Sequence, residues 1–371
     1  MAEHKKPEYG LLQIEPTSRC TLHCTTCLRG SHPSLWQERD LDPDIFQKLE
    51  DVFSRTQAVH IQGWGEPLLH PHLISFISLV KTAGSRVSFT SNGTIMDDDL
   101  AHRLFESGVD AITFSMAGAR PSTQDQLRGT GSFELLSRTL TTVNRVKKQL
   151  NKKKPLLAAS YLLTPATLPE LSRCLLLCRR WGIHLLAGVH LTHAANEHQL
   201  KLHIFSGKEK QPSKKRQGTA PWSATLLALL CRVELRLPTN TPSLLPVCDK
   251  NPLDNLFIAA DGSVSPCVFL NPPISREFSW LSDCCDTQKT PIRFGNLHQD
   301  DLDTVWNQES YRTFRQKFQS RIDIYQHYLG KVGYDMDGIE QLEQARKTIR
   351  KAFHDNPPPL PCRGCTKLLG F

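Results

Sequence analysis

The stretch RVSFTSNGTIMDDDLAHRLFESGVDAITFSM, residues 86–116, decides the fold class because it holds a complete unit of strand, helix and strand. Its two ends, RVSFTS (86–91) and DAITFSM (110–116), are apolar runs typical of buried strands. Between them an amphipathic helix pattern covers 97–107, and Gly108 stands where helices commonly end. A helical connection of this kind joins parallel strands, so the stretch predicts a βαβ unit.

The same alternation continues on both sides of this unit. Further strand-like runs occur at GLLQIE (10–15), QAVHIQ (57–62), LLAASYLL (156–163) and IHLLAGVHL (183–191). Further helix patterns cover 43–54, 71–83, 132–150 and 168–181, with Pro43 and Pro71 suited to first turns. Six strands in this alternation predict an α/β fold, a partial (βα)6 TIM-like barrel whose site lies at the carboxyl ends of the strands.

After residue 200 the pattern changes, which indicates a domain boundary. We expect a core barrel over 8–200, a basic linker over 201–221 and a smaller C-terminal α+β domain over 222–371. In the smaller domain, LFIAADGSVSPCVFL (256–270) is typical of a hairpin around Asp261 and Gly262, a dipeptide that a tight type I′ turn favours. Helix patterns follow the linker and the hairpin, at 222–236, 300–318 and 334–353.

Composition excludes several protein classes. With 39% hydrophobic and 22% charged residues, the 371-residue chain is neither wholly disordered nor collagen-like. The longest apolar stretch, 224–231, is too short to cross a bilayer, and the start MAEHKKPEYG has no apolar signal region. We therefore expect a cytoplasmic protein with no membrane partner. The chain has a net charge of +8, and its basic residues cluster at 145–154 and 208–216. We interpret these clusters as solvated loops and not as a nucleic-acid site.

Twelve cysteines without a secretion signal indicate metal binding more than disulfides. Cys20, Cys24 and Cys27 form a C-x3-C-x2-C group just after the first expected strand. Three thiolates at this spacing could hold three irons of a cubane cluster and leave one iron open. The alternative is a tetrahedral zinc site completed by His23 or His32.

Four motifs together resemble the radical S-adenosylmethionine (SAM) superfamily. They are EPTSRCTLHCTTC (15–27), GWGEP (63–67), the SNG of FTSNG (89–93) and the SMAG of ITFSMAG (112–118), each at the end of an expected strand. The resemblance covers about residues 8–195. Many relatives carry SLDG where this chain has Met116, Ala117 and Gly118, which leaves the substrate class open.

The resemblance implies that Cys20, Cys24 and Cys27 bind a [4Fe-4S] cluster, whose open iron takes the amino and carboxylate groups of SAM. Reductive cleavage would give a 5′-deoxyadenosyl radical that abstracts hydrogen from a substrate, with an external donor of the flavodoxin or ferredoxin type supplying the electron. No catalytic residue beyond the cluster ligands is implied. The implied SAM contacts are Gly65, Glu66 and Pro67 at the methionine amino group, Ser91 and Asn92 at the ribose, Ser115 at the end of the fourth strand, and Arg128 at the carboxylate.

A second cysteine set, Cys248, Cys267, Cys362 and Cys365, resembles the Twitch domain, a shortened SPASM extension that holds one auxiliary [4Fe-4S] cluster. A structural Cys₄ zinc site is the alternative. The spare pair Cys284 and Cys285 is adjacent in sequence, so we expect no second auxiliary cluster.

Other candidates have simpler interpretations. Cys174 and Cys178 share an apolar helix face and should pack in the core. His70 and His72 fit first-turn packing. His190 and His193 follow the sixth strand. They either point to the mouth of the site, where they would donate a proton or contact adenine or substrate, or lie on the surface.

The sequence thus predicts a radical SAM enzyme that oxidatively modifies a peptide, a protein or a small molecule. The alternative is a noncatalytic iron–sulfur or zinc-binding interaction protein that retains the barrel.

Overall fold

One curved sheet forms the centre of the computed structural model, which describes residues 7–205, 222–282, 285–330 and 338–371. Its strands run in the order β12-β9-β8-β1-β2-β3-β4-β5-β6-β7, and every pair from β8 to β7 is parallel. The barrel strands are β1 (Tyr9–Ile14), β2 (Thr56–Ile61), β3 (Arg86–Ser91), β4 (Ala111–Met116), β5 (Leu156–Leu163), β6 (Leu185–His190) and β7 (Glu234–Arg236). This is the expected partial barrel.

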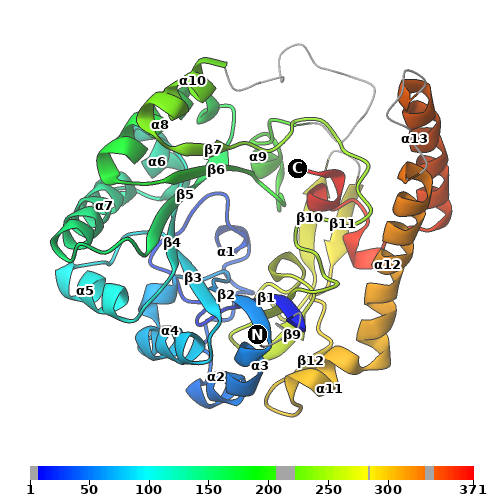
Figure 1. Cartoon of the computed structure of the whole chain (residues 1–371), viewed down its shortest axis with the longest axis horizontal. Helices are drawn as coiled ribbons and strands as arrows, with labels where there is room; N and C mark the ends of the chain where they lie inside the picture. Colours follow the sequence, from blue (N-terminus) through cyan, green and yellow to red (C-terminus); the bar gives the residue numbers. More distant parts are fainter. Residues whose placement is uncertain (1–6, 206–221, 283–284, 331–337) are drawn as a thin grey trace, which may run out of the picture.

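Helices cover the outer side of the arc of strands (Figure 1). They are α2 (Pro43–Lys48), α3 (Glu50–Ser54), α4 (Leu73–Thr82), α5 (Asp98–Glu106), α6 (Pro121–Arg128), α7 (Ser132–Gln149), α8 (Leu171–Trp181) and α10 (Trp222–Cys231). Alternation along β4 shows the two faces of the sheet, because Ile112 and Phe114 are buried while Thr113 and Ser115 stay partly exposed on the inner side. The apolar core therefore lies between sheet and helices, and polar side chains line the inside of the arc.

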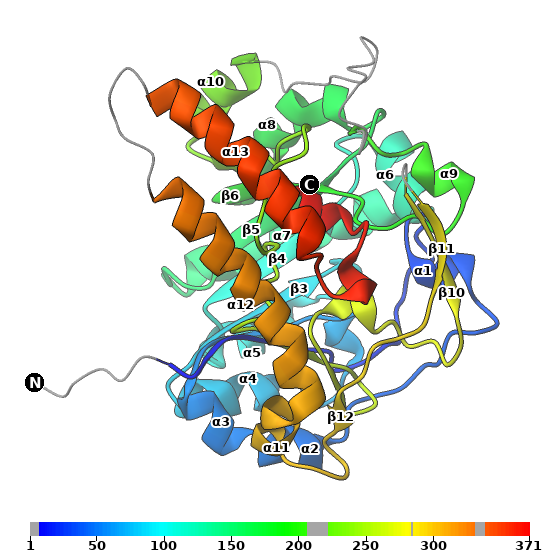
Figure 2. The ribbon, with the colours of Figure 1, turned by 90° about the vertical axis from the view of Figure 1, so that its right-hand side faces the viewer.

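The C-terminal part continues the same sheet. β8 (Leu256–Ile258) pairs with β1, and β9 (Ser263–Ser265) and β12 (Gly295–Asn296) extend the sheet as antiparallel strands. A separate hairpin consists of β10 (Phe278–Ser282) and β11 (Cys285–Lys289). Figure 2 shows α12 (Glu309–Leu329) and α13 (Gly338–Asp355) side by side, after the short α11 (Leu302–Asn307).

Several elements differ from the sequence predictions. The helix expected at 43–54 is split at Leu49, and the one expected at 300–318 is split at Gln308 and extends to Leu329. The helix expected at 222–236 ends at Cys231 and gives way to β7. Pro71 precedes α4, whose N-cap is His72.

The hairpin turn also differs. Among its residues only Gly262 has a positive φ, +77°, whereas a type I′ turn needs two such residues. The Gly262 amide donates to Ala259 O over 2.9 Å and the Ala259 amide to Ser263 O over 3.0 Å, the pattern of a three-residue loop that ends in a left-handed glycine.

Some predictions fall wholly or partly outside the described residues: most of the linker at 201–221, the basic run at 208–216, the start of the helix at 334–353, and Cys284. The domain boundaries themselves stay predictions. Within the described ranges, no helix combines the length and the apolar character that crossing a membrane requires.

Candidate radical SAM site

The C-x3-C-x2-C loop runs from the end of β1 to the short helix α1 (Leu28–Ser31), inside the arc of strands. It folds on itself through the Cys27 amide, which donates to Cys24 O over 3.1 Å. It is also fixed to the end of α6, because the Thr25 amide donates to Leu127 O over 3.0 Å. Burial raises the pKa of the Cys20 thiol, and that of Cys27 to about 12. The loop thus presents its three sulfurs in a partly buried setting.

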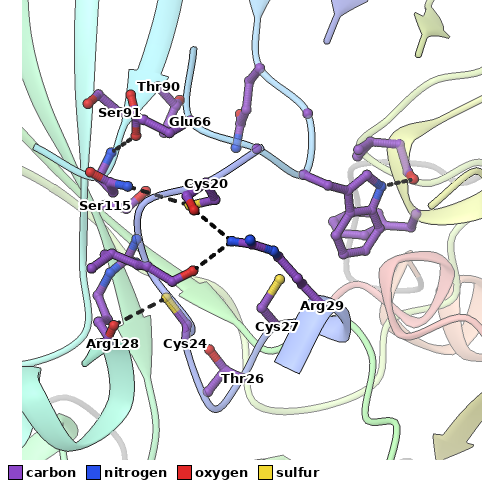
Figure 3. A pocket seen from close by; sticks show the side chains of 18 of the residues that line it. Cys20, Cys24, Thr26, Cys27, Arg29, Glu66, Thr90, Ser91, Ser115 and Arg128 are labelled. Atoms are coloured by element: carbon purple, nitrogen blue, oxygen red, sulfur yellow. Dashed lines mark hydrogen bonds between the residues drawn. The ribbon is translucent and has the colours of Figure 1, made fainter. Parts of the chain in front are cut away.

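One cavity gathers the cysteine loop and most of the expected SAM contacts (Figure 3). It lies at the carboxyl ends of the strands, as the barrel fold predicts. The expected residues that line it are Cys20, Cys24, Cys27, Gly65, Glu66, Ser91, Asn92, Ser115 and Arg128. Pro67 is absent from this lining, because its side chain is buried at the start of the 3₁₀ turn η1 (Pro67–Leu69).

Gly65 allows the GWGEP loop to lie directly against the cysteine loop. A Cβ atom at this position would stand 2.2 Å from Thr17 O and 2.5 Å from Arg19 O. The next amide, that of Glu66, donates to Arg19 O over 2.8 Å. Only a residue without a side chain fits between these backbones.

The Glu66 carboxylate is a buried connection between strands. Its Oε2 accepts from the Asn92 amide over 2.6 Å, and its Oε1 accepts from the Leu68 amide over 3.1 Å. Burial raises the Glu66 pKa, and these amides and the Ser91 hydroxyl oppose that rise. Glu66 therefore joins the end of β3 to the GWGEP loop.

Asn92 extends this connection to the cysteine loop. Its Nδ2 donates to Thr21 Oγ1 over 3.0 Å and lies 3.6 Å from Cys20 Sγ. Its Oδ1 accepts from the Thr94 amide over 2.9 Å. The SNG motif thus holds the first cysteine as well as lining the cavity.

Arg128 stands at the C-terminal end of α6, and its carbonyl oxygen lies 3.7 Å from Cys24 Sγ. Its Nε is buried and has no hydrogen-bond partner in the part of the chain that the structure describes. Because a buried unpaired guanidinium N–H is costly, this atom is suited to an anionic ligand.

The sequence reasoning missed Arg29, which lies among the three cysteines (Figure 3). Its Nη1 donates to Cys20 O over 2.7 Å and to Leu22 O over 3.2 Å, and its Nη2 pairs with Glu38 over 2.5 Å. Arg29 therefore fixes the loop and brings positive charge to its sulfurs. It follows the third cysteine by two residues, the only signal that could have indicated it.

Glu15 is a second missed residue. Its fully buried carboxylate accepts from the Trp64 amide over 2.6 Å and from the Ala260 amide over 3.1 Å. Burial raises its pKa to about 7 in spite of these hydrogen bonds. One side chain thus ties the end of β1 to the GWGEP loop and to the turn between β8 and β9.

The C-terminal part supplies the remaining wall of the cavity through Lys250, Val268 and Phe269. Trp64 Nε1 donates to Val268 O over 3.1 Å, which joins this wall to the GWGEP loop. His193 also lines the cavity, whereas His190 is buried elsewhere with its Nε2 3.0 Å from Thr239 O. Neither histidine lies on the surface.

The second cysteine set comes from three separate segments. Cys248 precedes β8, Cys267 follows β9, and Cys362 and Cys365 stand near the end of the chain, where the Cys365 amide donates to Cys362 O over 3.2 Å. Burial raises the pKa of each thiol, to about 11 for Cys248 and about 12 for Cys267, and neighbouring thiols of the set raise it further in Cys248, Cys267 and Cys362. The four sulfurs therefore lie in one buried region.

In the described ranges, no three or more His, Cys, Asp and Glu side chains form a group arranged to hold a metal ion. The ligand roles of both cysteine sets stay predictions. Cys174 and Cys178 are fully buried in the core cluster, as expected. His70 is buried against Phe76, with ring centroids 4.8 Å apart.

Gly65→Ala is expected to lower SAM cleavage about 100-fold, because backbone oxygens have no room to yield and a shift of about 1 Å misplaces the cysteine loop. The measurement is the rate of 5′-deoxyadenosine formation. Gly84→Ala is the control, since a Cβ there meets no atom within 4 Å although φ is +90°. Equal rates in the two variants would contradict the role of Gly65.

The chain belongs to the radical SAM superfamily. Residues 14–151 match that family, and residues 248–327 match the SPASM iron–sulfur cluster-binding domain. SAM, a [4Fe-4S] cluster and an auxiliary iron–sulfur cluster are accordingly its cofactors. The SPASM match includes Cys248 and Cys267 and ends before Cys362 and Cys365.

Curated relatives have diverse roles. A tungsten-containing aldehyde ferredoxin oxidoreductase cofactor-modifying protein from Pyrococcus furiosus is 26% identical over 82% of this chain and 82% of its own length. An AdoMet-dependent heme synthase from Methanosarcina barkeri is 31% identical over 37% and 39% of the two chains. A mycofactocin maturase from Mycobacterium ulcerans is 30% identical over 36% and 37%.

Solved structures share the fold. Streptococcus suis SuiB bound to S-adenosylmethionine aligns with a TM-score of 0.58 and 15% identity, over 82% of this chain and 67% of that one. Native anSMEcpe with bound AdoMet and a peptide aligns with a TM-score of 0.55 and 15% identity, over 83% of each chain.

Proposed function

We propose that this protein cleaves SAM reductively and uses the resulting 5′-deoxyadenosyl radical to abstract hydrogen from a peptide, a protein or a small molecule. The observation that carries the proposal is the meeting of the cysteine loop, the GWGEP loop and the SNG motif at one cavity. When bound, a [4Fe-4S] cluster supplies the electron for SAM cleavage, and the protein supplies position and shielding from water.

The residues present fit a cluster with SAM. The donor set is three thiols in one partly buried loop, which suits iron. The Nε of Arg128 is buried beside that loop without a hydrogen-bond partner among the described residues, and it would bind the SAM carboxylate. Gly65 allows backbone groups to approach the methionine amino group closely, and Ser91 and Asn92 are available for the ribose. Ser115 lines the same cavity from the end of β4 and would contact SAM there.

Glu66 and Asn92 have a second task, to hold the loops in place. They connect the GWGEP loop, β3 and the cysteine loop through the contacts described above. Such fixed loops keep a reactive intermediate in one orientation and limit side reactions.

The second cysteine set supports an oxidative outcome. An auxiliary cluster held by Cys248, Cys267, Cys362 and Cys365 would accept the electron that the substrate radical loses on oxidation, and an external donor of the flavodoxin or ferredoxin type would reduce the first cluster. The names of two relatives, a cofactor-modifying protein and a maturase, are in keeping with modification of a peptide or of another enzyme's cofactor.

The test is anaerobic reconstitution with iron and sulfide, chemical reduction, and addition of SAM. We expect 5′-deoxyadenosine and methionine, and about eight irons per chain from two cubanes. An iron content near four with stoichiometric zinc would indicate a zinc-bearing C-terminal part. Absence of 5′-deoxyadenosine from fully loaded protein would favour a noncatalytic iron–sulfur protein.

A further inference from the structure

One wall of the cavity, formed by Trp64, His193, Lys250 and Phe269, contains a buried histidine that the proposed SAM contacts do not use. His193 is 6% exposed and lines the cavity, and both of its ring nitrogens lack a hydrogen-bond partner among the described residues. Burying an imidazole in this way removes it from water without replacing the lost hydrogen bonds. A ligand in the cavity would provide that replacement.

Aromatic rings surround His193. Its ring centroid lies 5.2 Å from that of Trp64, 5.5 Å from Trp280 and 5.9 Å from Phe269. Trp64 and Phe269 themselves line the cavity, with centroids 6.4 Å apart and ring planes nearly perpendicular. This wall thus presents flat apolar surface around one polar ring.

Lys250 brings a positive charge to the same wall. Its Nζ lies 5.7 Å from the centroid of Phe269, and the residue lines the cavity. In the part of the chain that the structure describes, its ammonium group has no carboxylate partner. The wall is therefore cationic as well as aromatic.

We propose that Lys250 and His193 are the substrate-recognition residues, and that they bind a carboxylate-bearing substrate whose flat or apolar body lies against Trp64 and Phe269. The ammonium group pairs with the carboxylate, and His193 hydrogen-bonds it. This inference rests on the proposed function, since it assigns the substrate class of that same cavity.

A role in recognition has a consequence for stability that a structural role does not share. His193→Phe keeps a ring of similar size and removes two unsatisfied polar atoms, so the substrate-free holoenzyme should melt about 2 °C higher. The matched control is His190→Phe, a buried histidine three residues earlier, which loses the hydrogen bond to Thr239 O and should melt lower. If His193→Phe melts as low as the control, His193 is a structural residue and the inference fails.

Binding tests the substrate class directly. Phenylacetate and its neutral amide, 2-phenylacetamide, serve as probes in calorimetric titration of the SAM-loaded holoenzyme. We expect phenylacetate to bind about tenfold more tightly than the amide, and Lys250→Gln and His193→Phe each to remove most of that difference. Lys48→Gln, at an exposed lysine outside the cavity, should keep it.

Equal affinity for the two probes, or no binding of phenylacetate to the wild type, would overturn the inference. SAM cleavage is measured on the same wild-type sample. If the protein cleaves SAM but does not prefer phenylacetate, the inference is wrong and the proposed function stands. If it prefers phenylacetate but does not cleave SAM, the proposed function is wrong and the anion site stands.

Discussion

Replacing any one of Cys20, Cys24 and Cys27 by alanine is expected to reduce SAM cleavage to background while the protein stays folded. Each thiolate anchors a different iron in the proposed site, so the loss of one leaves the cluster without a complete set of ligands. The loop is also held by contacts that these substitutions spare, among them the hydrogen bonds of Arg29 to Cys20 O and Leu22 O. The fold should therefore survive.

The measurements are 5′-deoxyadenosine by chromatography and iron per chain. Cys178→Ala is the control, since this cysteine is fully buried on the core-facing side of α8 and lies far in sequence from the cavity loops. It should lower stability by an ordinary core truncation and retain iron. Near-wild-type cleavage in a variant that lacks all three loop cysteines would end the radical SAM proposal for this site.

The double substitution Cys362→Ala and Cys365→Ala is expected to separate SAM cleavage from substrate modification. Iron should fall by about four per chain, because two of the four proposed auxiliary ligands are lost. The hydrogen bonds that fix the cysteine loop and the GWGEP loop do not involve these two residues, so 5′-deoxyadenosine should still form. Modified substrate should become scarce, and the C-terminal part should melt earlier.

The matched control is Arg363→Ala, an exposed residue between the two cysteines, which should keep all the iron. Full substrate turnover in the double variant, with the second cluster demonstrably absent, would contradict a role in electron acceptance. These cysteines would then be structural only.

The sequence predicted the barrel well because its strands are apolar and regularly spaced. β3 and β5 occupy the expected residues, 86–91 and 156–163. Helix α6 was missed because PSTQDQLR buries only Gln124 and Leu127 and so has no continuous apolar stripe. The residues of β7 were predicted to be helical because three residues are too few to show the alternating hydrophobic pattern of a strand. Only their pairing with β6 makes them a strand.

The sequence motifs predicted the residues on one side of the cavity but not those that the C-terminal part contributes. Residues of the cysteine, GWGEP and SNG motifs could be named because they follow strands whose ends must meet. Lys250 and Phe269 reach the cavity only because β8 pairs with β1, a contact between segments about 240 residues apart in sequence that no local pattern indicates. For His190 and His193, sequence spacing could not decide which one faces the cavity.

The pairing of β8 with β1 also means that the barrel core and the C-terminal half cannot be exchanged independently between related proteins. Without β8, the backbone of Leu12, Gln13 and Ile14 would form an open sheet edge, and an open edge invites pairing between chains. Glu15, just beyond that edge, would lose the Ala260 amide and keep a buried carboxylate with one fewer donor. A core grafted onto the C-terminal half of a relative would need a new strand of matching register, so in this lineage the two halves are expected to be inherited and exchanged together.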